Sequence, residues 1–194
     1  MTAQRFSEIA QRIAAMAAQQ KGPLFVGIDG RCGSGKSSLA AAIAEKVPCA
    51  VFHMDDFYLP FSRRAQNWEQ TPGGNIDFAR LFEECITPAL AGKTVLYRAY
   101  NCPDDALKPA IPVSPCGIYL VEGSYSLHPA LAAPYALTVF LHCSKEVQAQ
   151  RLRRREGAHF KAFETRWIPM EERYFAAYPV QQNATFTLDT DDLF

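Results

Sequence analysis

The sequence lacks the features that would place it at a membrane, outside the cell or on nucleic acid. No apolar run approaches the ~20 residues that cross a bilayer. The N-terminal stretch carries Arg5, Glu8 and Arg12 and has no apolar core of a secretory signal. The formal net charge of the chain is zero, with 20 basic and 20 acidic residues. No overall charge attracts polyanions, so we expect neither a nucleic-acid nor a membrane partner.

Paired cysteine motifs are missing as well. The six cysteines are scattered, none forms a C-x-x-C pair, and no histidine stands at zinc-finger spacing. We therefore expect neither disulfides nor a structural zinc site. Reduced thiols are typical of the cytoplasm, which is the location we expect.

Length and composition indicate a single domain over residues 1–194. Of the 194 residues, 48% are apolar and 21% are charged, which suits one domain with a sizeable core. Near the start, Phe6, Ile9, Ile13 and Met16 recur at helical spacing. This pattern predicts an amphipathic helix over 3–19 that packs on the domain.

A glycine-rich segment carries the strongest signal. Residues 30–37 read Gly-Arg-Cys-Gly-Ser-Gly-Lys-Ser and fit G-x-x-x-x-G-K-[ST], the phosphate-binding P-loop. An apolar run at 24–28 precedes the segment and a helix-prone stretch at 38–46 follows it, which is the context that the motif requires. Glycines let backbone N–H groups converge on phosphate oxygens, and a helix N-terminus favours the same anion. The segment therefore predicts binding of a nucleoside triphosphate with Mg²⁺. We expect ATP, and the sequence leaves GTP open.

Individual residues of this loop have distinct predicted roles. Lys36 supplies a positive charge to the β- and γ-phosphates, and Ser37 offers a hydroxyl to Mg²⁺. Cys32 is either a thiol whose pKa is lowered by the helix dipole and Lys36 or a passive loop residue, and we favour the passive role. The residues predicted to bind the nucleotide are Gly30, Gly33, Ser34, Gly35, Lys36, Ser37 and Ser38.

Strands and helices alternate along the chain. The predicted strands lie at 24–29, 50–54, 94–97, 117–121, 137–141 and 184–188. The predicted helices after the P-loop lie at 38–46, 76–90, 144–155 and 160–178. Residues 60–75 are predicted to form a loop, and residues 101–115, with four prolines, an irregular excursion. The alternation predicts an α/β fold, a three-layer sandwich with a mostly parallel sheet and helices on both faces, in which ligands bind at the carboxyl ends of the strands.

Acidic residues follow two of these strands directly. Asp55 and Asp56 come after the strand at 50–54, and Glu122 comes after the strand at 117–121. Phosphoryl transfer uses one carboxylate as a proton acceptor and others to hold Mg²⁺. Each acid alone is equally compatible with a helix cap, but together beside a P-loop they favour a catalytic site.

The P-loop, the segment Asp55-Asp56-Phe57-Tyr58 and the pair Glu122-Gly123 together resemble the uridine kinase and phosphoribulokinase family of P-loop small-molecule kinases. The resemblance covers about residues 24–178. It implies a P-loop NTPase fold with a helical lid at about 144–176. It also implies that Asp55 is the catalytic base near the magnesium and that Glu122 helps to hold Mg²⁺.

The resemblance also implies contacts with the acceptor and the phosphates. Tyr58, the last residue of the D-x-F-Y segment, would contact the acceptor. Asp77 would contact a ribose, and Tyr100 would line a base pocket. The run 151–155 resembles the arginine-rich lid, and Arg166 would join it. Helical spacing places Arg151, Arg154 and Arg155 on one side of a helix and Arg153 on another. The alternative to a lid is that these arginines form a solvated helix face. The lid arginines that we assign to catalysis are Arg151 and Arg155.

The acceptor side departs from uridine kinases. Asp56 stands where those enzymes commonly have serine, and no histidine follows Tyr100. We therefore expect transfer of the γ-phosphoryl group to a hydroxyl of a small molecule. A nucleoside is the first candidate for this acceptor. Pantothenate, a sugar or a nucleoside monophosphate bound by Arg63-Arg64 or Arg80 are alternatives, as is a nucleotide-dependent regulatory module. The sequence leaves open whether identical chains form a homo-oligomer.

Overall fold

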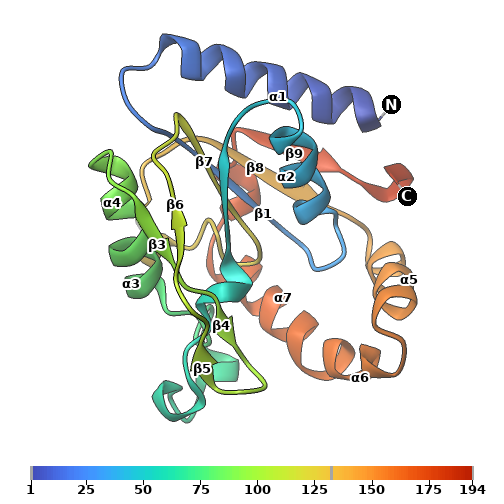
Figure 1. Ribbon diagram of the computed structural model, residues 1–194. Helices are drawn as coiled ribbons and strands as arrows, with labels where there is room; N and C mark the ends of the chain where they lie inside the picture. Colours follow the sequence, from blue (N-terminus) through green and yellow to red (C-terminus); the bar gives the residue numbers. More distant parts are fainter. Residues whose placement is uncertain (1, 132, 194) are drawn as a thin grey trace.

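The computed structural model describes residues 2–131 and 133–193 and is built around one five-stranded parallel sheet (Figure 1). In spatial order the strands are β2 (Ala50–His53), β7 (Ile118–Glu122), β1 (Leu24–Gly30), β8 (Tyr135–His142) and β9 (Phe186–Asp189). All four pairings are parallel. Every residue of the central strands β1 and β7 is buried, which explains their continuous apolar sequence.

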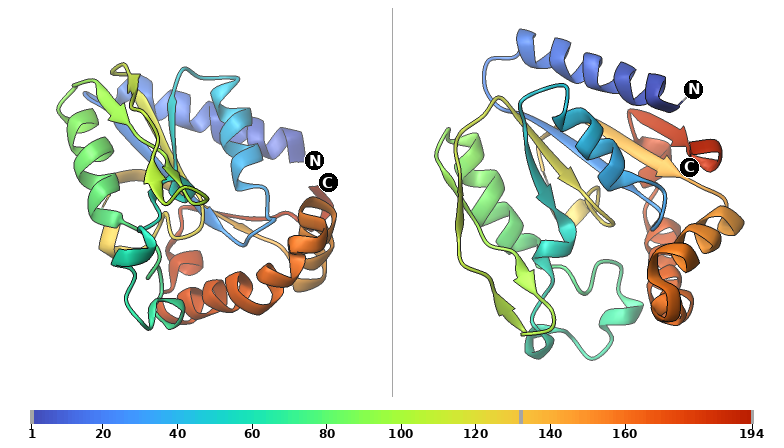
Figure 2. Two further views of the ribbon diagram at one scale, coloured as in Figure 1. Left: turned by 60° about the horizontal axis from the view of Figure 1, so that its bottom comes forward. Right: turned by 45° about the vertical axis from the view of Figure 1, so that its right-hand side comes forward.

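Helices cover both faces of the sheet, as predicted (Figure 2). One face packs against α1 (Thr2–Gln19) and α2 (Lys36–Ala44), and the other against α3 (Phe78–Leu81), α4 (Thr87–Leu90) and α7 (Ile168–Ala177). Because Phe6, Ile9 and Ile13 recur at helical spacing, their side chains lie on one face of α1 and pack into the hydrophobic core between α1, α2 and the sheet. Among the described residues, no helix combines the length and the apolar character that a membrane crossing requires. The predicted α/β three-layer sandwich is confirmed.

Two long predicted helices are interrupted by π-helical turns. The helix predicted from 76 begins at Phe78, because Asp77 caps it by accepting a hydrogen bond from the backbone N–H of Arg80 (3.1 Å). A π-helical turn at Phe82–Ile86 joins α3 to α4. In the lid region Ser144 caps α5 (Lys145–Glu156). After it come α6 (Phe160–Ala162), a second π-helical turn (Phe163–Trp167) and α7. The short α8 (Val180–Asn183) precedes β9.

Two sequence predictions around residues 94–115 are corrected. The strand at 94–97 is β3 (Val95–Tyr97), but it lies outside the main sheet and pairs antiparallel with β6 (Ile111–Val113). The predicted irregular excursion also contains a second ribbon, β4 (Tyr100–Asn101) with β5 (Ala106–Leu107). A two-stranded ribbon tolerates Pro112 because each strand has a free edge, where no backbone N–H is needed.

A buried carboxylate joins three of these elements. Asp29, at the end of β1, is 0% exposed and accepts hydrogen bonds from the backbone N–H of Gly30 (2.7 Å) and of Leu127 (2.9 Å). The hydroxyl of Tyr174 on α7 donates to the same carboxylate (2.8 Å). Burial raises the pKa of Asp29 to about 6, although these donors and Lys36 oppose the change.

We predict that Asp29→Asn changes how stability depends on pH. The folded protein binds a proton on Asp29 near pH 6, whereas the carboxyl in an unfolded chain does so near its ordinary value of 3.8. The stability that this proton contributes is present below about pH 4 and is lost as the pH rises through about 6, a change of at most about 3 kcal/mol. Urea unfolding of both proteins from pH 4 to 8 measures the difference, and equal pH dependence would contradict the prediction.

Candidate active site

A cleft lies at the carboxyl ends of the central strands, where the sheet topology predicts a ligand. Its volume is about 450 Å³. The P-loop, the turn after β2, the loop after β7 and the lid contribute its walls. The lining residues are Cys32, Gly33, Gly35, Lys36, Ser37, Ser38, Asp55, Tyr58, Asn75, Glu122, Gly123, Ser124, Tyr125, Arg151, Arg155, Phe163, Trp167 and Glu171.

The P-loop has the backbone shape that its glycines predict. Gly30, Gly33 and Gly35 have φ angles of 139°, 75° and 95°, a region that glycine adopts without strain. Helix α2 begins at Lys36, so its unpaired N–H groups face the cleft. The ammonium of Lys36 donates to the carbonyls of Gly30 (2.9 Å) and Arg31 (3.0 Å). These contacts hold the charge of Lys36 inside the loop.

Five of the seven predicted nucleotide-binding residues line the cleft. Gly30 and Ser34 do not. A Cβ atom on Gly30 would lie 2.1 Å from the carbonyl oxygen of Leu141, so this glycine lets the loop cross β8 closely. Ser34 is fully buried below the loop surface.

The predicted magnesium ligands lie together. The hydroxyl of Ser37 donates to the two carboxylate oxygens of Glu122 at 3.2 and 3.3 Å, and Asp55 lines the same cleft. These oxygen donors suit Mg²⁺, which takes one or two protein ligands and completes its shell with phosphates and water. Within residues 2–131 and 133–193, no group of three or more His, Cys, Asp or Glu side chains is arranged to hold a metal alone.

His53, which the sequence analysis did not single out, contacts a lining residue of the cleft. Its Nδ1 lies 2.5 Å from Oε1 of Glu122, and this hydrogen bond raises the pKa of His53. The imidazole therefore orients the carboxylate that also accepts from Ser37. The sequence signal that could have revealed this contact is the position of His53 at the end of β2, where it pairs with Glu122 of the neighbouring strand β7.

Asp55 and Tyr58 form the acceptor-side corner of the cleft. Both come from the turn after β2, and the hydroxyl of Tyr58 donates to Oδ1 of Asp55 (2.8 Å). Burial raises the pKa of Tyr58, so its hydroxyl stays protonated and fixes the carboxylate. The Tyr58 ring stacks on Trp167 of the lid at 6.4 Å between centroids.

The lid arginines divide into two groups. Arg151 and Arg155 line the cleft, whereas Arg154 does not and is exposed, so helical spacing alone was insufficient to place it. Arg151 also donates to the carbonyl of Gly33 (3.2 Å) and to Thr190 Oγ1 (3.2 Å). Arg153 points elsewhere, as predicted, and stacks on Phe160 (4.7 Å).

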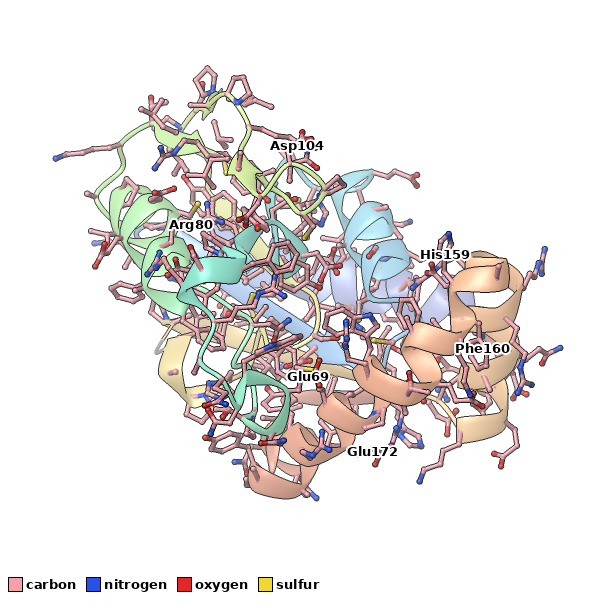
Figure 3. All side chains as sticks on the ribbon, turned by 90° about the horizontal axis from the view of Figure 1, so that it is seen from below. Glu69, Arg80, Asp104, His159, Phe160 and Glu172 are labelled. Carbon is pink, nitrogen blue, oxygen red and sulfur yellow. The ribbon has the colours of Figure 1, made fainter. Side chains whose placement is uncertain are left out.

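Three predicted substrate residues lie outside the lining of the cleft. Asp77 caps α3 and accepts from Arg63 (2.7 Å), and Tyr100 donates to Asp105. Arg166 forms an ion pair with Glu69 (2.8 Å). Figure 3 shows Glu69 on the loop that reaches toward α7, with the lid residues His159 and Phe160 and the loop residue Asp104 at other edges of this face.

A carboxylate that the sequence did not reveal touches the P-loop. Glu171 of α7 is 1% exposed, and its Oε2 accepts from the backbone N–H of Cys32 (2.5 Å). Gln148 of α5 donates both to Oε1 of Glu171 (2.8 Å) and to the carbonyl of Cys32 (3.1 Å). Arg31 lies 3.6 Å from Glu171 and forms an ion pair with Glu172. Helices α5 and α7 thus both contact the backbone of Cys32 in the loop.

These contacts also decide the role of Cys32. Burial and the nearby charge of Glu171 raise the pKa of the Cys32 thiol. The alternative that the helix dipole and Lys36 lower this pKa is therefore wrong. The thiol lies 3.8 Å from Ser124 Oγ. Cys32 is therefore a packing residue of the loop.

Comparison with known proteins supports the fold. No family model matches the chain. A possible uridine kinase from Bacillus stearothermophilus is 20% identical, with a TM-score of 0.68 over 94% of this chain and 100% of that chain. A protein from Silicibacter sp. TM1040, provisionally named as a fructose transport system kinase, is 22% identical, with a TM-score of 0.69 over 94% of this chain and 98% of that chain.

A third solved structure has the same fold at lower identity. YFH7 from Saccharomyces cerevisiae, provisionally named as a P-loop containing kinase with a circular permutation, is 11% identical, with a TM-score of 0.68 over 96% of this chain and 99% of that chain. Uridine kinase-like and other P-loop kinases are thus structural neighbours, as the sequence resemblance predicted. The chain has the α/β fold of P-loop kinases.

Proposed function

We propose that the protein transfers the γ-phosphoryl group of ATP to a hydroxyl of a small molecule. The observation that carries the proposal is the meeting of three strand ends in one cleft. The P-loop with Lys36, the pair Ser37 and Glu122, and the Asp55 carboxylate all line it. Donor-phosphate, metal and proton-acceptor groups are the parts that phosphoryl transfer needs.

Each group has a physical role in this proposal. Loop N–H groups and the Lys36 ammonium orient the phosphates of ATP, and bound Mg²⁺ neutralises charge on them. Asp55, held by Tyr58, accepts the proton of the attacking hydroxyl. Arg155 faces the transferred group from the lid and helps to exclude water.

The acceptor was expected to be a nucleoside, and the structure disfavours one of its alternatives. A nucleoside monophosphate needs an arginine cluster that faces the cleft. Arg63 is paired with Asp77, and Arg80 donates to the carbonyls of Arg98 (2.7 Å) and Asp56 (2.5 Å). Arg64 stacks on Phe61 (4.4 Å). These arginines are engaged by the protein and do not line the cleft.

A panel of nucleosides, monosaccharides, pantothenate and nucleoside monophosphates with γ-labelled ATP tests the proposal. Labelled product with at least one hydroxyl acceptor supports it. Failure to label any member, together with nucleotide-dependent binding to a protein, would favour a regulatory module instead.

We predict that Asp55→Asn separates binding from turnover. The amide cannot take up the proton of the acceptor hydroxyl, so kcat falls roughly 100- to 10,000-fold while the affinity for ATP stays nearly unchanged. Labelled product and titration with a fluorescent ATP analogue measure the two quantities. Asp56→Asn is the matched control, because Asp56 does not line the cleft and its carboxylate accepts a hydrogen bond from Tyr97 (2.5 Å). Unchanged turnover in Asp55→Asn would remove Asp55 as the base.

We predict that Arg155→Ala lowers kcat about 10- to 100-fold, because a positive charge is lost beside the transferring group. Arg154→Ala is the matched control on the same helix, since its side chain is exposed and lies outside the cleft. Steady-state kinetics of both variants at saturating ATP provide the measurement. Equal effects of the two substitutions would contradict a role for Arg155 in the cleft.

A further inference from the structure

Asn75 is a buried polar side chain of the cleft with an unsatisfied oxygen. The residue is 1% exposed and lines the same cleft as Asp55. Its Oδ1 atom has no hydrogen-bond partner in the described part of the chain. A buried amide oxygen without a donor destabilises a fold, so proteins rarely retain one. At the wall of a cleft, the missing donor is one that a ligand supplies.

The backbone places Asn75 beside the proposed base. The N–H of Leu59 donates to the carbonyl of Asn75 (2.8 Å), and Tyr58 and Ile76 pair as an antiparallel bridge. Tyr58 is also the residue whose hydroxyl holds Asp55. The backbone of Asn75 therefore lies one strand spacing from the residues that follow the proposed base Asp55.

The turn before Asn75 is rigid. Gly73 has a φ angle of 68°, which favours glycine. A Cβ atom on Gly74 would lie 2.5 Å from the carbonyl oxygen of Trp68, so the two segments are in close contact. The N–H of Ile76 closes the turn on the carbonyl of Gly73 (2.9 Å). Asn75 is therefore held in position before any ligand arrives.

An aromatic wall completes this half of the cleft. Tyr58 and Trp167 both line it, and their rings are stacked with 21° between their planes. Aromatic faces carry partial negative charge and attract the C–H face of a sugar ring, whose hydroxyls point sideways to polar partners. An amide oxygen beside such a wall matches that combination.

The residues expected to recognise the acceptor have other partners. Both carboxylate oxygens of Asp77 are occupied, one by the N–H of Arg80 (3.1 Å) and the other by Arg63 (2.7 Å). Tyr100 donates to Asp105. Among the described residues that line the cleft, Asn75 is the one with a buried side-chain oxygen that has no hydrogen-bond donor.

We propose that Asn75 accepts a hydrogen bond from a sugar-ring hydroxyl while the ring lies against Tyr58 and Trp167. The hydroxyl that faces Asp55 is then a second hydroxyl of the same acceptor. This inference rests on the proposed kinase function and names its substrate class. A free monosaccharide and the ribose of a nucleoside share this chemistry.

Calorimetric binding of D-ribose, D-fructose, uridine and pantothenate tests the inference, with a non-hydrolysable ATP analogue present. The variant is Asn75→Leu, whose side chain has the same branched arrangement of four heavy atoms and no amide, and Asn67→Ala is the control, an exposed asparagine of the same loop. We expect at least one sugar-containing probe to bind and its affinity to fall roughly tenfold to a hundredfold in Asn75→Leu. The affinity for the ATP analogue stays unchanged. The midpoint of thermal unfolding stays unchanged or rises, because a buried unsatisfied oxygen is removed.

Binding of uridine without the free sugars assigns the ring to a nucleoside, and the reverse assigns it to a monosaccharide. Either result, with the loss in Asn75→Leu, supports the inference. Sugar affinity that is unchanged in Asn75→Leu overturns it, as does binding of pantothenate alone or of no probe. A parallel loss of thermal stability and of affinity for the ATP analogue would show that Asn75 is structural and would overturn it too.

The same proteins, assayed with γ-labelled ATP, separate this inference from the proposed function. Sugar binding that depends on Asn75 without labelled product refutes the kinase and leaves the sugar site standing. Labelled sugar made equally well by Asn75→Leu refutes the sugar site and leaves the kinase standing.

Discussion

The hydrogen bonds that converge on the buried carboxylate of Asp29 hold three walls of the cleft at fixed positions. The N–H of Gly30 sets the direction in which the P-loop leaves β1, and the N–H of Leu127 fixes the loop after β7. Tyr174 holds α7 against the same point. Because all three donors depend on one group, a change at Asp29 moves the phosphate, metal and lid sides together.

The lid is tied to the P-loop by the same helix face. Glu171 and Tyr174 stand one turn apart on α7, so both point toward β1 and its loop. Gln148 grips the Cys32 peptide from α5. Helices α5 and α7 are therefore both tied to the P-loop and the end of β1. The negative charge of Glu171 lies beside a phosphate-binding loop, and Arg31, 3.6 Å away, compensates for it.

The donor half of the site could be predicted from sequence because its geometry is local. Residues 30–37 fold as one loop, and the acids after β2 and β7 reach it because parallel strands end at the same edge. The grip of Glu171 on Cys32 could not be predicted, since 139 residues separate the two and no pattern marks either partner. The ribbon strands other than β3 were missed because they are short. β4, β5 and β6 are two or three residues long, and β6 contains Pro112, so these three lack a strand pattern.

The acceptor half resisted prediction because neighbouring residues compete for its polar groups. Asp77 matches the motif, yet Arg63 and the start of α3 satisfy both of its oxygens. Asn75 stands two positions earlier and matches no functional pattern, but it is buried in the cleft wall with an unsatisfied oxygen. A motif specifies which residue types are present, whereas hydrogen-bond partners decide which of them remain available to a ligand. In the proposed kinase, the side chains that remain available to an acceptor therefore depend on this pairing, which only the folded structure reveals.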